Sequence, residues 1–547
     1  MNFNTKSSFI VVTVCLLLGW ASELSGQKDF YNEYTFTTAD TLRGMLRPER
    51  TCYDVYFYDL NIEVNPDQRF LEGYVDIYFH SKNAFDRLQI DLYANMAIDK
   101  IICQGKECSY QRQFDAVFVQ TPVFQSGERG QLRIHYHGQP QVAQNPPWDG
   151  GFVWTYDENG KNWIGVACEG DGASLWWPNK DHLSDEPDSM SIQVTVPQSL
   201  VCIANGDLRR IAPVDQQKMR YEWFVSYPIN NYNVTVNIGD YVQFGEDYQA
   251  QDGSKMPLDY YVLSYNKDQA IKHFQQVPGV LRCFEQYFGK YPFWEDGFAL
   301  VETPYLGMEH QGAIAYGNQY KRGYLGGMIP EDMDWDYIIV HETGHEYFGN
   351  SVSCNDLSEM WIHESFTTYM EALYVECQYG YEDAIRYLDN FRNQSYIANY
   401  EPILGPDNVN WEDWQYSDHY FKGSWVLHTL RNAIDDDEKW FELLHAFYQR
   451  NAISNIHSET FYDLVAAFTE KDYGAFFEQY LEYPKMPVFE YRLQQDGLDL
   501  KVDFRWKAEV AAFDMPIKIG HPSQYQMVYP NTQGWKSIRL SNIQERL

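Results

Sequence analysis

The segment DWDYIIVHETGHEYFG, residues 334–349, decides how the chain is interpreted, because it contains His341-Glu342-Thr343-Gly344-His345. Two histidines four positions apart lie on one side of an α-helix, where their imidazoles can bind a single divalent ion. Glu342 directly follows His341 and would stand beside a water molecule at that ion. We therefore predict a helical metal site with Glu342 as the catalytic base. The competing interpretation is a structural pair of core histidines.

A second segment offers a third ligand. A catalytic zinc usually takes three protein groups and leaves the fourth position to water. Eighteen residues separate His345 from Glu364, which lies near the start of the helical segment HESFTTYMEALYVEC. An antiparallel pair of helices would bring this carboxylate back to the imidazoles. Alone, Glu364 would be a solvated helix residue; with the upstream motif, we predict that His341, His345 and Glu364 bind one Zn²⁺ per chain.

This ligand set and its spacing resemble the zinc peptidases of the aminopeptidase N family, a gluzincin family that also contains leukotriene hydrolase. Upstream, Gly307-Met308-Glu309-His310 is similar to the Gly-x-Met-Glu-Asn motif of that family, with His310 where Asn is usual. The resemblance implies that Glu309 binds the α-ammonium group of the substrate. It also places Gly307, Met308 and His310 in the substrate pocket.

Three further segments extend the resemblance. Tyr420-Phe421-Lys422-Gly423 is similar to the Tyr-x-Lys-Gly segment of the family, whose Tyr stabilises the tetrahedral intermediate, so that role falls to Tyr420. The segment from Cys168 to Ala173 resembles one that adds a Gln or Glu to the amine pocket, which makes Glu169 a candidate. Glu359 stands where the family has an Asp, and would orient a metal ligand without touching the metal. His363 and Ser365 depart from the pattern, because Asn and Gly usually flank the distal ligand.

The hydrophobic pattern predicts a multidomain α+β fold. Alternation with a period of two, as in Leu71-Glu72-Gly73-Tyr74-Val75-Asp76-Ile77, predicts an N-terminal all-β domain over residues 27–246. Helical spacing follows, with segments near 334–349, 363–380, 382–399, 420–435, 437–449 and 458–481. Together with the resemblance, it indicates a thermolysin-like, mostly helical catalytic domain over residues 247–484. Alternation returns in a short C-terminal β unit, residues 485–547.

Composition excludes several classes of protein. Lys and Arg number 42 against 77 Asp and Glu, which leaves a net charge of −35. A field of this sign repels nucleic acid and anionic lipid head groups, so we expect no nucleic-acid partner. Hydrophobic residues make up 44% and aromatic residues 17% of the chain, as in a folded protein rich in aromatic side chains.

The first 26 residues resemble a secretory signal peptide, because Lys6 precedes an apolar run from Phe9 to Leu18. That run is shorter than the roughly 18 apolar residues that span a bilayer. We therefore expect export to a periplasm or the outside medium, with no stable membrane insertion of the mature chain; a retained anchor is the alternative. The oligomeric state stays open.

The cysteines are too sparse for a disulfide scaffold. Cys103 and Cys108 are close enough to bridge across a turn, and buried free thiols are the alternative. Asn233-Val234-Thr235 fits a glycosylation acceptor, although such tripeptides are common by chance.

These observations predict a secreted zinc metallo-aminopeptidase that hydrolyses the first peptide bond of peptides with a free α-amino group. Two alternatives use the same residues. One is another zinc hydrolase, either an endopeptidase or an epoxide hydrolase, and the other is a metal-binding scaffold without turnover. The preferred N-terminal side chain does not follow from the sequence.

Overall fold

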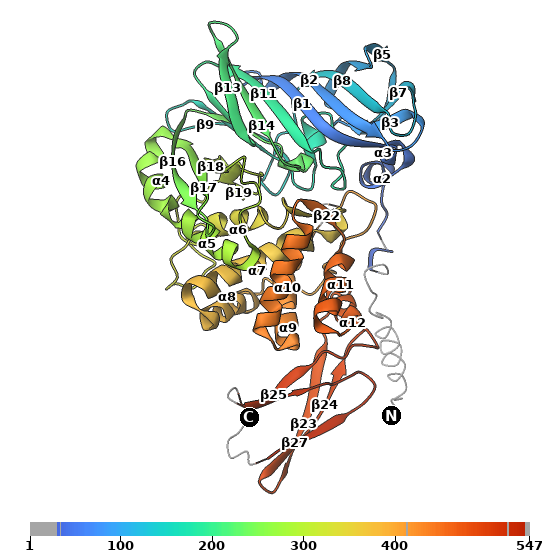
Figure 1. Ribbon diagram of the computed structural model, residues 1–547, viewed down its shortest axis with the longest axis vertical. Coiled ribbons are helices and arrows are strands. Elements are labelled where there is room, and N and C mark those ends of the chain that lie inside the picture. The colour runs from blue at the N-terminus through green and yellow to red at the C-terminus, as the bar shows by residue number, and fades with distance from the viewer. Residues whose placement is uncertain (1–29, 33, 412–413, 522–523, 542–547) are drawn as a thin grey trace, which may run out of the picture. The chain divides into compact units, whose positions relative to one another are not determined.

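The computed structural model describes residues 30–32, 34–411, 414–521 and 524–541 (Figure 1). The chain divides into two compact units. The larger unit comprises Phe36–Ala398 and Leu404–Tyr473, and the smaller one is formed mainly by Gly474–Leu547 with Asn399–Ile403. The signal peptide predicted for residues 1–26 lies outside the described residues.

A large sheet forms the N-terminal part of the larger unit. It has eight strands in the order β13 (Asp207–Pro213), β14 (Lys218–Val225), β11 (Ser189–Pro197), β1 (Tyr53–Asn65), β2 (Phe70–Ser81), β8 (Arg129–Gly138), β4 (Met96–Cys103) and β5 (Lys106–Cys108). Strand β1 pairs antiparallel with β2 and parallel with β11. Leu71, Val75 and Ile77 on β2 are fully buried, so the alternation predicted from the sequence marks the face of the sheet that packs on the core.

Three smaller sheets complete the β structure of this region. The first contains β3 (Phe85–Asp91), β7 (Ala116–Phe124) and β6 (Tyr110–Gln113). The second contains β12 (Val201–Ala204), β15 (Val236–Gly239), β10 (Asn162–Ala167) and β9 (Gly151–Tyr156). The third contains β16 (Tyr241–Gln249), β17 (Lys255–Leu263), β18 (Phe298–Glu302), β20 (Ile314–Tyr316) and β19 (Gly307–Met308). Glu169 follows β10 closely, and Glu309 follows the edge strand β19, so both residues lie where strands end.

Helices make up most of the remainder of the larger unit. They are α4 (Lys267–His273), α5 (Val277–Phe288), α6 (Tyr337–His345), α7 (Trp361–Tyr379), α8 (Tyr381–Asn393), α9 (Phe421–Ile434), α10 (Asp437–Asn451) and α11 (Ser458–Thr469). Helix α7 packs against α6, α8 and α9 and is therefore the centre of this helical layer (Figure 1). A short parallel pair, β21 (Val352–Cys354) and β22 (Ser454–Ile456), links the segment that follows α6 to the segment that follows α10.

Short elements occur where the sequence predicted none. Helices α2 (Thr38–Gly44) and α3 (Pro48–Thr51) precede β1, and Thr37 caps α2 by a reciprocal pair of hydrogen bonds with Asp40. Single helical turns are η1 (Ala173–Leu175), η2 (Asn231–Asn233), η3 (Ser264–Asn266), η4 (Phe274–Gln276) and η5 (Leu357–Glu359). Propensity and periodicity give little signal for elements of three to seven residues.

The single helix predicted over residues 458–481 is wrong in one respect. Helix α11 ends at Thr469, because Glu470 adopts a left-handed conformation with φ of 56° and the Thr469 hydroxyl accepts a hydrogen bond from the Lys471 amide. The chain then re-enters helical structure in α12 (Gly474–Phe477) and the π-helical η6 (Glu478–Glu482). Residues 470–473 therefore separate α11 from α12, two helices that the hydrophobic spacing had merged into one.

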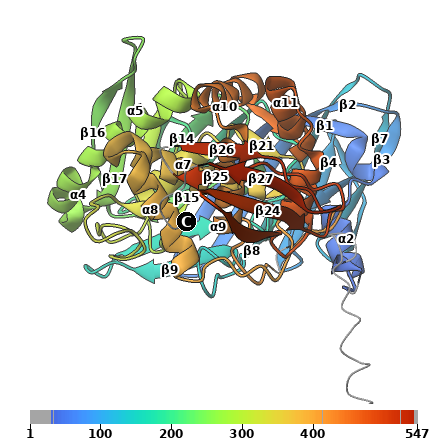
Figure 2. The ribbon, with the colours of Figure 1, turned by 90° about the horizontal axis from the view of Figure 1, so that it is seen from below.

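The C-terminal strands confirm the predicted β unit. Strands β23 (Val488–Asp496), β24 (Asp499–Lys507) and β27 (Lys536–Leu540) form one sheet, and β25 (Ile517–His521) and β26 (Gln524–Val528) form a separate ribbon (Figure 2). Leu500, Val502 and Phe504 of β24 are buried together with Val528 and Leu540. The multidomain α+β fold is thus confirmed: an N-terminal β region, a helical region and C-terminal strands.

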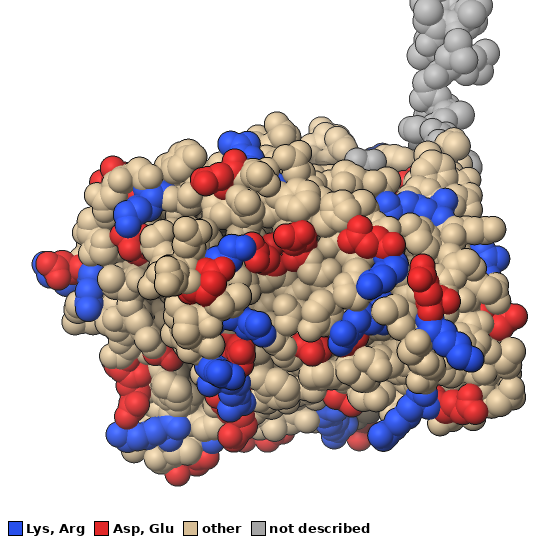
Figure 3. All heavy atoms as spheres, turned by 90° about the horizontal axis from the view of Figure 1, so that it is seen from above, with Lys and Arg blue, Asp and Glu red and all other residues tan. Residues whose placement is uncertain are grey.

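The surface carries charge of both signs. On the face seen in Figure 3, acidic and basic side chains are intermixed, so the negative excess is not gathered into one patch there. Among the described residues, no helix is both long and apolar enough to cross a membrane.

Candidate active site

Helix α6 presents the first two predicted ligands. Asp336 caps its N-terminus by accepting a hydrogen bond from the Ile339 amide, and the other oxygen of Asp336 contacts His273 Nε2 at 2.7 Å and the Tyr316 hydroxyl at 2.8 Å. This anchoring fixes where the helix begins and therefore which way its side chains point. His341 and His345 then lie on one face, with their Nε2 atoms 3.1 Å apart.

Helix α7 brings Glu364 to the same point. Its Oε2 lies 3.7 Å from His341 Nε2 and 3.4 Å from His345 Nε2, and all three side chains are buried. The three groups predicted as metal ligands, two from α6 and one from α7, therefore converge on one small space.

The outer ring nitrogens of both histidines are held away from this space. His345 Nδ1 lies 3.0 Å from the Phe348 carbonyl oxygen, and His341 Nδ1 lies 2.5 Å from Glu371 Oε1. The second oxygen of Glu371 accepts a hydrogen bond of 2.6 Å from the Tyr387 hydroxyl. Because Nδ1 donates in each case, Nε2 keeps its lone pair for a metal.

The space fits a divalent cation. Two imidazole nitrogens and one carboxylate oxygen are the donor set that zinc takes in catalytic sites. Glu364 Oε2 is buried and has no hydrogen-bond partner among the described residues, which is costly unless a cation binds there. Burial by itself would lower the pKa of His345, but the carboxylates of Glu364 and Glu309 raise it to about 9. The surroundings therefore favour positive charge at this point.

Glu342 lies beside the ligand set on α6. Burial raises the pKa of its carboxyl group to about 8, against the opposing influence of His341 and His345. Strand β19 passes close to α6, which explains why position 307 is a glycine. A Cβ atom on Gly307 would lie 2.5 Å from Glu342 Oε1 and 2.8 Å from Ile338 Cγ2. The backbone at Gly307 can therefore pass close to the Glu342 carboxylate only without a side chain.

Tyr420 approaches from the start of α9. Its ring stacks on that of His341, with centroids 6.2 Å apart and planes at 21°. Burial and the neighbouring Glu364 carboxylate raise the pKa of Tyr420 well above its usual value, so the phenol keeps its proton as a hydrogen-bond donor. The position of Gly423 in the same motif is constrained by packing, because a Cβ atom there would overlap Ser365 Oγ on α7.

Glu309 and Glu169 line the same cavity as the ligand set. Burial and the Glu309 carboxylate raise the pKa of Glu169 well above its usual value. Glu309 is 3% exposed and accepts a 3.0 Å hydrogen bond from the Tyr232 hydroxyl at Oε1, and its main-chain oxygen accepts one of 2.7 Å from Asn350. The two carboxylates proposed from the motifs therefore lie together, although 140 positions separate them in the chain.

Two predicted residues lie elsewhere. His310 is fully buried, both of its ring nitrogens lack hydrogen-bond partners within the described part of the chain, and it does not line the cavity as Met308 and Glu309 do. Burial lowers the pKa of His310 to about 3, so the ring is neutral. Glu359 accepts hydrogen bonds from His457 Nδ1 (2.8 Å) and the Ser458 amide (2.6 Å) at the start of α11. The carboxylate that contacts a predicted ligand histidine, His341, is Glu371 and not Glu359.

A cavity of about 670 Å³ opens in front of these groups. The side chains of Glu169, Asp171, Glu309, Glu342 and Glu364 line it, and among the described lining residues there is no Lys or Arg. Aromatic rings form much of the remaining wall: Trp148, Tyr324, Tyr337, Tyr396, Trp411, Trp414, Tyr416, His419, Tyr420 and Phe421. The cavity thus combines a strongly acidic floor with an apolar wall.

Glu371, Tyr232 and this aromatic wall were not predicted from the sequence. Glu371 could have been found, because it lies seven residues after Glu364, two helical turns along the same face. Tyr232 and the wall carry no such signal, since their segments come from separate parts of the chain.

Comparisons with known proteins agree with this site. Residues 273–480 match the Peptidase family M1 domain. Aminopeptidase N of Lactococcus lactis subsp. lactis is 25% identical over 236 residues, which are 40% of this chain and 27% of that protein. Probable aminopeptidase 1 of Sulfurisphaera tokodaii is 21% identical over 436 residues, 76% of this chain and 52% of that protein. The chain therefore spans about a quarter to a half of the length of these relatives.

A solved structure shares the fold. The M1 zinc metallopeptidase from Deinococcus radiodurans superposes with a TM-score of 0.67 at 20% identity, over 83% of this chain and 98% of that one. A variant of that protein, solved with a Tyr-Ser-Ala substrate, gives a TM-score of 0.66 over 83% of this chain and 99% of that one.

Proposed function

We propose that this chain, whose residues 273–480 match the Peptidase family M1 domain, is a zinc-dependent aminopeptidase that removes N-terminal residues from peptides with a free α-amino group. His341, His345 and Glu364 would hold one zinc ion per chain. Glu342 would act as the general base, and Glu309 with Glu169 would bind the α-ammonium group.

One observation carries this proposal. Five carboxylates line the cavity without a Lys or Arg among its described lining residues. Buried carboxylates that remain charged need cationic partners. The His341–His345–Glu364 set would use the metal ion, and Glu309 and Glu169 beside it would be left for a second cation. The α-ammonium group of a peptide supplies that charge and places the first peptide bond next to the metal ligands.

The roles of the side chains follow from their chemistry. When bound, zinc supplies a Lewis acid that makes a water molecule acidic near neutral pH and polarises a carbonyl group. The buried Glu342 carboxylate takes the proton of the attacking water and later returns it to the leaving amine nitrogen. The Tyr420 hydroxyl donates a hydrogen bond to the carbonyl oxygen as negative charge develops on it. Glu309 and Glu169 hold the amine end, so the scissile bond cannot slide along the cavity.

The test uses two matched substrates, an aminoacyl p-nitroanilide with a free amine and its N-acetyl form. We expect hydrolysis of the free form only, loss of the rate on chelation, recovery with zinc, and loss of turnover in Glu342→Gln. Equal hydrolysis of the acetylated substrate would instead identify an endopeptidase. A zinc-loaded chain that hydrolyses neither substrate would contradict the assignment and favour the scaffold.

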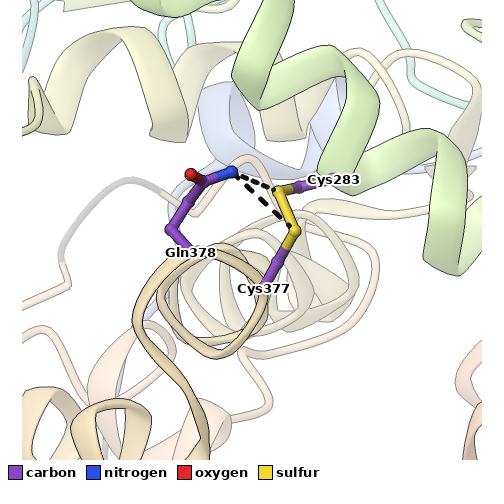
Figure 4. The surroundings of a disulfide bond; sticks show 3 residues. All are labelled: Cys283, Cys377 and Gln378. Atoms are coloured by element: carbon purple, nitrogen blue, oxygen red, sulfur yellow. Dashed lines mark hydrogen bonds between the residues drawn. A yellow bond between two sulfur atoms is a disulfide. The ribbon is translucent and has the colours of Figure 1, made fainter.

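We also propose export to an oxidising compartment, as the signal-like residues 1–26 imply. In support, Cys283 of α5 and Cys377 of α7 form a disulfide, with the Gln378 amide beside both sulfur atoms (Figure 4). Structural disulfides form in exported proteins and are rare in a reducing cytosol. Cys103 and Cys108, by contrast, are free thiols. Fractionation of cells that express the full chain, with and without residues 1–26, tests this proposal; cytosolic retention of the full chain would contradict it.

A further inference from the structure

A short segment of the β-rich region, Asn230–Asn233, which contains η2, contacts Glu309 from behind the cavity lining. All four side chains of this segment are buried. The segment carries no catalytic motif, and its one sequence pattern is the glycosylation acceptor tripeptide that begins at Asn233. In the fold, Asn233 is fully buried and its Nδ2 donates to Asn230 and to Asn350, both at 2.6 Å, so the side chain has a structural use.

Two chains of hydrogen bonds lead from this segment to Glu309. In the first, the Tyr232 hydroxyl donates to Glu309 Oε1 at 3.0 Å. In the second, Asn233 donates to the Asn350 side-chain oxygen, and Asn350 Nδ2 donates to the Glu309 main-chain oxygen at 2.7 Å. The segment therefore holds both the carboxylate and the backbone of Glu309.

His363 determines which way the Tyr232 hydroxyl donates its hydrogen bond. The Cys354 amide donates to His363 Nε2 at 2.9 Å, so this nitrogen carries no proton and the neutral ring has its proton on Nδ1. Nδ1 lies 3.5 Å from the Tyr232 oxygen and can only donate to it. Because a lone pair of the Tyr232 oxygen accepts the His363 proton, the hydroxyl proton of Tyr232 is directed to Glu309.

We infer that Tyr232, oriented by His363, is a positioning residue for the amine pocket, holding the Glu309 carboxylate where it meets the α-ammonium group of the peptide. The inference rests on the proposed function. A hydroxyl that fixes one carboxylate oxygen leaves the other oxygen for the substrate and prevents the side chain from turning away from the cavity. Tyr232 therefore acts on recognition of the amine and leaves the metal ligands and the attack on the carbonyl unchanged.

Binding to a zinc-loaded Glu342→Gln chain tests this inference without turnover. The probes are the peptide Tyr-Ser-Ala and its N-acetyl form, with the dissociation constant measured by calorimetry. In this background we expect Tyr232→Phe to weaken binding of Tyr-Ser-Ala about 10-fold, the order of one hydrogen bond to a charged group, with unchanged zinc content. Tyr221→Phe is the matched control, because its buried hydroxyl donates to the Leu200 carbonyl oxygen at 3.2 Å, away from the site; it should leave binding unchanged.

Two further variants keep the inference open to refutation. His363→Asn should weaken binding by about threefold, since Tyr232 keeps its hydroxyl but loses its orienting partner. When Glu309→Gln is already present, Tyr232→Phe should have no further effect, because the two residues act as one unit. Unchanged affinity in Tyr232→Phe, or the same loss with and without Glu309→Gln, would overturn the inference and leave the proposed function intact. Equal affinity of the free and acetylated peptides in the parent chain would overturn both.

Discussion

Substitution of Glu371 should weaken zinc binding without touching a metal ligand. Glu371 is fully buried, and its two oxygens lie 2.5 Å from His341 Nδ1 and 2.6 Å from the Tyr387 hydroxyl. The carboxylate keeps the His341 proton on Nδ1 and increases the basicity of Nε2. Glu371→Gln keeps the shape but removes the charge, whereas Glu371→Ala also frees the ring to rotate.

The expected size follows from that contact. Loss of such an outer partner typically costs 10–100-fold in metal affinity, which is about 1–3 kcal/mol. We expect Glu371→Gln near the lower end of this range and Glu371→Ala near the upper end. Zinc competition with a chromophoric chelator measures the dissociation constant, and Glu382→Gln, an exposed change on α8, is the control. Activity lost in low zinc should return when zinc is in excess. An affinity within twofold of the parent in both variants would refute the reasoning.

Four other predictions address the remaining parts of the structure. Tyr420→Phe should lower kcat about 10²–10³-fold with little change in KM, because the lost donor acts on charge that develops in the transition state; steady-state kinetics that show a change in KM alone would contradict this. Gly307→Ala should lower kcat at unchanged zinc content, since its Cβ atom would lie 2.5 Å from Glu342 Oε1. Cys377→Ser should lower the free energy of unfolding by about 2–4 kcal/mol in urea titrations, and the difference from the parent should vanish in reductant. Burial raises the pKa of Glu186 to about 7 from 4.5, so the folded chain binds more protons than the unfolded one between these values, and stability contributed by this group falls as pH rises through them. Urea midpoints at pH 5 and pH 8 should therefore differ less in Glu186→Gln than in the parent.

The metal set could be predicted from the sequence because it depends on local geometry. His341 and His345 are one helical turn apart, and Glu364 needs only a helix that returns, so spacing and period determine the outcome. The β region was equally accessible, since alternation such as that along β2 directly encodes a half-buried strand. In both cases the deciding interactions lie within one element or between neighbouring elements.

The rest of the site depends on long-range contacts that have no local signal. Glu309 accepts a hydrogen bond from Tyr232, which lies 77 positions earlier in the chain. Asn350 donates to the Glu309 main-chain oxygen and accepts a hydrogen bond from Asn233, which lies 117 positions before Asn350. The same limitation explains Glu359, whose motif position suggested a supporting role, while its carboxylate caps α11 about 100 residues later in the chain. A short motif identifies a residue type and a position, but the partner of that residue follows from the fold.

Two departures from the family pattern, Ser365 and His363, have hydrogen-bond partners in the fold, whereas both ring nitrogens of His310 lack one among the described residues. Ser365, in place of Gly, donates a 2.6 Å hydrogen bond to the His419 carbonyl oxygen and lies against Gly423, which has no side chain to obstruct it. His363, in place of Asn, accepts from the Cys354 amide and contacts Tyr232. Ser365 and His363 therefore keep buried hydrogen bonds beside Glu364, and comparison of turnover by the parent and by Glu342→Gln separates a working pocket from an inactive scaffold.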